Sequence, residues 1–151
     1  MRMLIVEDQK YPLMALELAV KSLSDKAILK VDELKVVKCY LDAERLFDSK
    51  EYDIILLDNR MPMENLGDLE DTDFEKFSQS LKNIGYSLIP RIREKSPHAL
   101  IIGTSSLSRD ELRELPTPDY KMSKMFDDAE TDLERILKEC GRRWATILPV
   151  I

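Results

Sequence analysis

The sequence predicts an α/β protein built around a parallel sheet, and two observations lead to this prediction. Short apolar runs alternate with amphipathic helical segments along the chain, which is typical of β-α-β units with right-handed crossovers. Several of the apolar runs are followed directly by a carboxylate or hydroxyl residue. A chain of 151 residues can bury a sizeable core, so we expect one domain over residues 1–151.

The first half of the chain holds three predicted strands and two helices. Pro12 suits the first turn of a helix, and the apolar residues after it, Leu13, Leu16, Val20 and Leu23, recur at helical spacing. The run before Asp58 is short, apolar and followed by turn residues, which is typical of a buried strand. In order, we expect a strand at 3–6, a helix from Pro12, a strand at 34–39, a helix at 42–49 and a strand at 53–57.

The second half continues the alternation. Pro90 lies inside one helical segment, where it should kink the helix or mark its true start, and Pro116 should end the next. In order, we expect a helix at 83–95, a strand at 99–103, a helix at 109–115, a weak strand at 119–123 and a terminal helix from Asp127. The apolar positions of the terminal helix are Ala129, Leu133, Ile136, Leu137, Cys140 and Trp144.

Residues 63–82 interrupt this rhythm, because connections between a strand and its helix usually have about 2–6 residues. The segment holds six acidic residues and two lysines, a local charge of −4 within the chain's net charge of −6. Thr72 and Glu75 match a capping box, and apolar residues follow at helical spacing. We therefore expect an acidic insertion with a short helix near residues 73–82, acting either as a solvated decoration or as a docking surface.

Composition excludes several classes of function. A net charge of −6 argues against nucleic-acid binding, which needs clustered basic residues. No apolar run approaches the roughly 20 residues of a membrane span, and the N-terminus turns acidic too early for a signal peptide. Cys39 and Cys140 fit no metal-binding spacing, so we expect reduced thiols in a cytoplasmic protein.

Five polar residues should meet at one edge of the sheet. Glu7 and Asp8 end the first strand, Asp58 ends the third, Thr104 ends the fourth and Lys124 follows the fifth; the carboxyl ends of parallel strands share an edge. Three carboxylates alone would repel one another. Hard oxygen ligands suit Mg²⁺, and with Lys124 the cation would let a phosphoryl group approach Asp58, since phosphoryl transfer depends mainly on positioning and charge stabilisation.

The motifs at these strand ends resemble those of the receiver domain of two-component response regulators. They are Ile5-Val6-Glu7-Asp8, Asp58-Asn59-Arg60-Met61-Pro62, Thr104-Ser105 and Lys124. The resemblance implies a flavodoxin-like, doubly wound (βα)5 fold with a five-stranded parallel sheet in the order 2-1-3-4-5. It also implies a stand-alone receiver, because no output domain follows, and a monomer or weak homodimer.

Roles for individual residues follow from the resemblance. Asp58 corresponds to the phosphoacceptor, Thr104 to the switch hydroxyl and Lys124 to the lysine that pairs with the phosphoryl group. Magnesium would be held by Glu7, Asp8 (the more direct of this pair), Asp58 and the backbone carbonyl of Arg60. The partners would be a histidine kinase or phosphotransfer protein upstream and a protein target downstream, in a phosphorelay. The chain would catalyse only its own phosphorylation and dephosphorylation.

Departures from the family pattern leave alternatives. Met125 follows Lys124 where the family usually has proline, and the aromatic switch position falls on Tyr120 or on Lys121. Met125 and the insertion at residues 63–82 favour, as an alternative, a non-phosphorylated pseudo-receiver that acts as an interaction module. A hydrolase of the haloacid dehalogenase type is a further alternative, but it needs an aspartate where this chain has Arg60.

Overall fold

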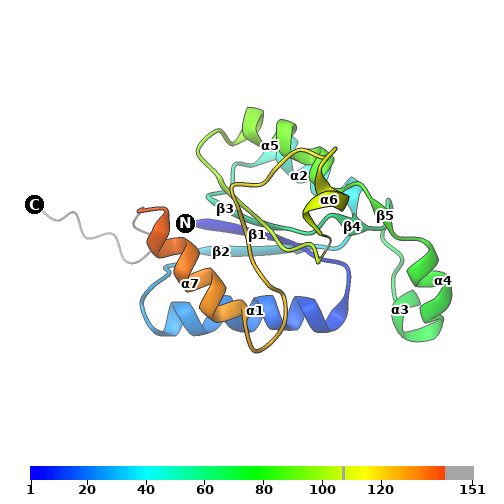
Figure 1. Ribbon diagram of the computed structural model, residues 1–151, viewed down its shortest axis with the longest axis horizontal. Coiled ribbons are helices and arrows are strands. Elements are labelled where there is room, and N and C mark those ends of the chain that lie inside the picture. The colour runs from blue at the N-terminus through cyan, green and yellow to red at the C-terminus, as the bar shows by residue number, and fades with distance from the viewer. Residues whose placement is uncertain (107, 142–151) are drawn as a thin grey trace, which may run out of the picture.

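Five parallel strands form the central sheet of the computed structural model, which describes residues 1–106 and 108–141 (Figure 1). The strands are β1 (Arg2–Val6), β2 (Glu33–Val37), β3 (Ile54–Leu57), β6 (Leu100–Gly103) and β7 (Tyr120–Lys121). Their order is β2-β1-β3-β6-β7, and every neighbouring pair is parallel. This is the predicted order 2-1-3-4-5, although β7 is shorter than the predicted strand.

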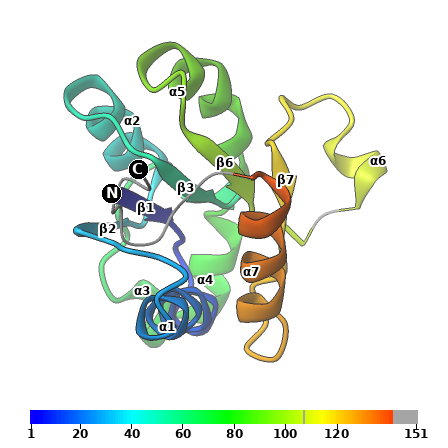
Figure 2. The ribbon, with the colours of Figure 1, turned by 90° about the vertical axis from the view of Figure 1, so that its left-hand side faces the viewer.

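Helices cover both faces of the sheet, as Figure 2 shows in a view along the strands. On one face, α1 (Lys10–Asp25) and α7 (Ala129–Glu139) pack against Met3, Ile5, Ile54 and Leu56. On the other, α2 (Tyr40–Ser49), the 3-10 helix η1 (Gly85–Leu88) and α5 (Ile89–Lys95) pack against Leu4, Val6, Ile55 and Leu57. Because both faces are covered, β3, β6 and residues 3–6 of β1 are continuous apolar runs rather than alternating ones.

Three predicted helices differ in extent. Pro90 lies in the first turn of α5, so it marks the start of the α-helix, and the residues before it form η1. Helix α6 (Arg109–Leu112) is shorter than predicted; Ser108 and Glu111 form its capping box. Helix α7 ends before Gly141, whose φ is 68°, while Trp144, predicted for that helix, lies outside the described residues.

The insertion contains two short helices rather than one, α3 (Leu69–Thr72) and α4 (Phe74–Gln79). The predicted capping box is wrong. Asp73 separates the two helices, and its carboxylate accepts the Lys76 N–H at 3.2 Å, while the Thr72 hydroxyl donates to the Asp68 carbonyl instead. An aspartate beside the helix start competes well with threonine for the cap position.

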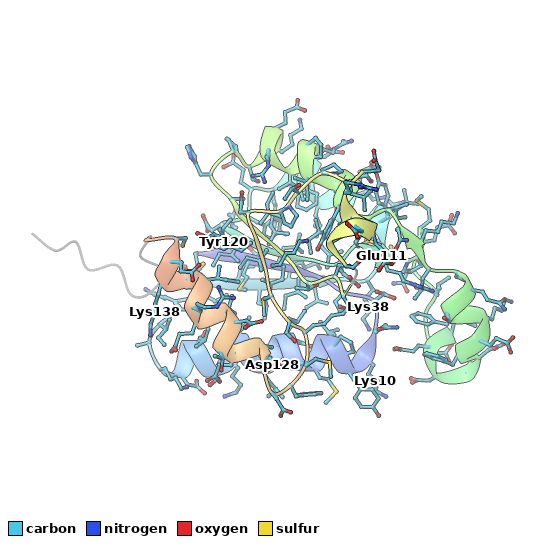
Figure 3. The ribbon with its side chains drawn as sticks, in the orientation of Figure 1. Lys10, Lys38, Glu111, Tyr120, Asp128 and Lys138 are labelled. Atoms are coloured by element: carbon cyan, nitrogen blue, oxygen red, sulfur yellow. The ribbon has the colours of Figure 1, made fainter. Side chains whose placement is uncertain are left out.

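Two more strands, which the sequence did not reveal, close the base of the insertion. Strand β4 (Arg60–Met61) pairs antiparallel with β5 (Lys82–Asn83). Helices α3 and α4 lie beyond the carboxyl ends of the parallel strands, at the right of Figure 1. The Lys10 N–H, at the start of α1, donates to the Glu70 carboxylate of α3 at 2.9 Å (Lys10 is labelled in Figure 3). The insertion thus caps α1 and stands at the edge where the polar residues gather.

None of the helices in the described part of the chain is long and apolar enough to span a bilayer.

Candidate functional site

The carboxyl edge of the sheet positions the polar side chains through its backbone ladder. The N–H groups of Glu7, Asp58 and Thr104 donate to carbonyls of the adjacent strands at 3.1, 3.2 and 2.9 Å, which extends each strand by one residue. All three side chains are almost completely buried. The apolar runs that form the sheet therefore also position the side chains of Glu7, Asp58 and Thr104 at its carboxyl edge.

Three carboxylates form the centre of the site. One ligand oxygen from each of Glu7, Asp8 and Asp58 lies within 4.8 Å of the others. The Asn59 N–H donates to the Asp58 carboxylate at 2.8 Å, and the Gln9 N–H donates to Glu7 at 3.0 Å. Both carboxylate oxygens of Asp8 are buried and have no hydrogen-bond partner among the described residues. A cluster of hard oxygens with one carboxylate unsatisfied fits a magnesium ion.

Lys124 bridges two of these carboxylates. Its Nζ lies 2.9 Å from Asp58 Oδ2 and 3.0 Å from Glu7 Oε1. Hydrogen bonds hold the backbone on both sides of Lys124. The Ser123 N–H donates to the Asp132 carboxylate of α7 at 2.8 Å, and the Met125 N–H donates to the Ser123 hydroxyl at 3.0 Å. Lys124 therefore reaches Asp58 even though Met125 follows it.

The protonation behaviour of the site follows from burial and crowding. Burial, and then the charges of Glu7 and Asp58, raise the pKa of Asp8 to about 8. Burial also raises the pKa of Asp58 and of Glu7, against the opposing influence of Lys124. Burial lowers the pKa of Lys124, but the two carboxylates outweigh it and the net shift is upward. Lys124 thus stays charged while the carboxylates compete for protons, which is typical of like charges held close together.

A pocket of about 280 Å³ opens over Asp58. Its lining residues are Gln9, Asp58, Arg60, Ser78, Leu81, Ser105, Ser106 and Lys124. Ser78 and Leu81 belong to the insertion, so the insertion forms one wall of this pocket. The Arg60 guanidinium donates to the Ser78 carbonyl at 3.3 Å, which holds this side chain at the pocket's rim.

The remaining predicted residues lie after β6, in β4 and in β7. The Thr104 hydroxyl is buried without a hydrogen-bond partner among the described residues. The backbone N–H of Arg60 contributes to lowering the pKa of Asp58, so the Arg60 backbone is adjacent to the carboxylate; its carbonyl as a metal ligand stays a prediction. Of the two candidates for an aromatic switch, Tyr120 packs against the α1–α7 side of the core and Lys121 is exposed.

Two buried residues at the site were missed from the sequence. Asn59 is fully buried, and its side-chain oxygen accepts the Tyr86 N–H at 3.0 Å. Tyr86 is also fully buried, and its hydroxyl accepts the Ser105 N–H at 3.3 Å. Gly85 was the available signal, because a Cβ there would lie 2.0 Å from the Asp58 carbonyl oxygen. Glycine is favoured where two backbone segments approach closely, so Gly85 hinted at a contact with the Asp58 backbone, although not at the contacts of Tyr86.

No protein-family model matches the sequence, and no curated protein matches it. Solved structures do. The receiver domain of a sensor histidine kinase from Pseudomonas aeruginosa PAO1, with a magnesium ion coordinated in its active site cleft, is 23% identical, with 91% of this chain and 94% of that chain covered and a TM-score of 0.63.

Two further solved structures share the same arrangement. The BeF3-activated receiver domain of DrrB is 19% identical over 93% of this chain and 97% of its own, with a TM-score of 0.60. A response regulator from Thermotoga maritima is 17% identical over 93% and 98%, with a TM-score of 0.54. The predicted resemblance is therefore confirmed at the level of architecture: this chain has the fold of response regulator receiver domains.

Proposed function

We propose that this chain is a receiver that accepts a phosphoryl group on Asp58 from the phosphohistidine of a kinase or phosphotransfer protein, and signals by contact with other proteins. The observation that carries the proposal is the position of Lys124 Nζ, 2.9 Å from Asp58 Oδ2, beside two further buried carboxylates. A cation fixed on the acceptor oxygen stabilises the charge that develops during phosphoryl transfer.

The transfer needs little more from the protein. An Asp58 oxygen forms the new P–O bond while the P–N bond of the donor breaks, and the imidazole keeps the electron pair and takes a proton from solvent. Lys124 stays protonated and pairs with a phosphoryl oxygen. The Thr104 hydroxyl, buried and without a partner in the described part of the chain, is available to donate to another.

Magnesium would be held by Asp8, Glu7, Asp58 and the Arg60 carbonyl, where it would neutralise charge on the phosphoryl oxygens. The unsatisfied oxygens of Asp8 support this assignment. So does the magnesium ion in the active site cleft of the Pseudomonas receiver domain. We propose that the chain turns over no separate substrate and acts only on its own phosphorylation state.

Incubation with Mg²⁺ and a small phosphodonor, followed by intact mass measurement, tests the proposal. We expect one added phosphoryl group on the wild type and none on Asp58→Asn. Asp25→Asn is the matched control, because Asp25 is an exposed aspartate at the far end of α1, and it should label like the wild type. If the wild type takes no phosphoryl group while a known receiver labels in parallel, the proposal fails in favour of a non-phosphorylated interaction module.

A further inference from the structure

Tyr86 connects the residue after Asp58 with the residue after Thr104. Its backbone N–H donates to the Asn59 side chain at 3.0 Å, and its hydroxyl accepts the Ser105 N–H at 3.3 Å. The ring is fully buried. Burial raises the pKa of the Tyr86 hydroxyl to about 12, so the group stays neutral and serves as a hydrogen-bonding partner throughout the physiological range.

The end of β6 is shaped around this hydroxyl. A Cβ at Gly103 would lie 2.2 Å from the Tyr86 hydroxyl oxygen and 2.8 Å from Pro118. Any side chain at Gly103 would therefore push Tyr86 away from Ser105. The hydroxyl lies where the chain leaves the sheet, beside the backbone of Thr104 and Ser105, and Ser105 lines the pocket over Asp58.

Tyr86 also borders a second pocket, on the side of α6 and β7. This pocket has a volume of about 370 Å³, and its lining includes Tyr86, Leu112, Pro118 and Lys121. Tyr120 of β7 lines this pocket as well, but it packs against the α1–α7 side of the core. Of the two tyrosines, Tyr86 is the one that also contacts the backbone beside the pocket over Asp58, through the Ser105 N–H.

We infer that Tyr86 is a positioning residue, which anchors the Thr104–Ser105 backbone through the Ser105 N–H and passes any displacement of that backbone to the pocket between α6 and β7. The first part, in which Tyr86 anchors this backbone, depends only on the hydrogen bonds and the packing of Tyr86. The second part, in which a phosphoryl group on Asp58 causes the displacement, rests on the proposed function.

The hydrogen bond between the Tyr86 hydroxyl and the Ser105 N–H can be exchanged for a stronger one. A hydrogen bond of 3.3 Å between neutral groups is weaker than one to a charged acceptor. Ser105 lines the pocket over Asp58, so a phosphoryl oxygen there would compete for the same N–H. When that N–H leaves Tyr86, the ring loses its polar contact at the end of β6 and can move toward the second pocket.

Hydrogen exchange measured by NMR on the full chain tests both parts. Tyr86→Phe removes the hydroxyl and keeps the ring. Tyr52→Phe is the matched control, since the Tyr52 hydroxyl is buried without a partner among the described residues and lies before the amino end of β3. In the free protein we expect the Ser105 amide to exchange about fivefold faster in Tyr86→Phe and at the wild-type rate in Tyr52→Phe.

The same spectra with Mg²⁺ and beryllofluoride, a mimic of the phosphoryl group, test the transmission. We expect the amides of Thr117, Asp119, Tyr120 and Lys121 to respond in the wild type and in Tyr52→Phe, and to lose that response in Tyr86→Phe while beryllofluoride still binds. An unchanged Ser105 rate in free Tyr86→Phe overturns the anchor, and a wild-type response of these four amides in that variant overturns the transmission. If the wild type neither binds beryllofluoride nor labels, the proposed function and the transmission both fall, and the anchor is decided by the free protein alone.

Discussion

Replacing Asp8 with asparagine should stabilise the protein when no divalent cation is bound. Both Asp8 oxygens are buried without hydrogen-bond partners in the described part of the chain. Glu7 and Asp58 lie within a few ångströms, and together with burial they raise the pKa of Asp8 to about 8. An amide at this position carries no charge and can donate to either neighbouring carboxylate.

The size of the effect follows from the difference in proton affinity between the folded and unfolded states. The pKa of Asp8 rises on folding from 3.8 to about 8, so the unfolded chain releases the proton first as the pH increases. Each pH unit between these values lowers the free energy of unfolding by about 1.4 kcal/mol. At pH 7 this gives a ceiling of about 4 kcal/mol; solvent in the pocket over Asp58 screens the charges, and we expect a gain of about 2 kcal/mol for Asp8→Asn.

Urea unfolding in EDTA at pH 5 and at pH 8 measures the effect. We expect Asp8→Asn to exceed the wild type by more at pH 8 than at pH 5, with the exposed Asp25→Asn unchanged as control. Added Mg²⁺ should raise the unfolding midpoint of the wild type but hardly that of Asp8→Asn, because ligand binding stabilises only a fold that can bind it. An Asp8→Asn protein less stable than the wild type at pH 8 in EDTA would refute the reasoning.

Three further substitutions or modifications probe the same region and the core. Gly85→Ala should lower the free energy of unfolding by about 3 kcal/mol, because the new Cβ meets the Asp58 carbonyl oxygen; a loss in urea unfolding below about 1 kcal/mol contradicts this. Lys124→Met should cost about 3–5 kcal/mol at pH 8 and less at pH 5, because burial raises the pKa of Glu7 and of Asp58 and the partners of Lys124 lose negative charge as the pH falls. Equal losses at both pH values would count against this prediction. A thiol reagent should modify Cys140 in the folded protein but Cys39 only on unfolding, because Cys39 is 1% exposed and burial raises its pKa. Mass spectrometry would show which cysteine is modified, and rapid reaction of Cys39 in the folded protein would contradict its burial.

The sheet was predictable because its strands carry their signal locally. Residues 3–6 of β1 and the whole of β3 and β6 are apolar runs buried on both faces, and each is followed by a polar residue whose backbone N–H is held by the ladder. The proximity of Glu7, Asp58 and Lys124 follows from that topology alone, since parallel strands deliver their carboxyl ends to one edge. The roles of these residues stay predictions until the labelling experiment is done.

The parts that escaped prediction depend on contacts between distant residues or on close local competition. Strands β4 and β5 have two residues each, too few for any periodicity to appear. The Tyr86 hydroxyl bonds a backbone N–H 19 residues away, and a backbone partner leaves no mark in the sequence. At the start of α4, the expected capping box of Thr72 and Glu75 did not form, because the adjacent Asp73 is a better cap than threonine and accepts the Lys76 N–H.

The small ladder at the base of the insertion affects how the chain can vary. Met61 and Lys82 are paired, so the two ends of the intervening segment are held side by side whatever lies between them. The entropy lost on closing such a loop grows only with the logarithm of its length. The segment can therefore be lengthened, shortened or exchanged as a cassette without changing the register of any parallel strand. Because Ser78 and Leu81 also border the pocket over Asp58, each exchange would give the same buried carboxylate a different entrance.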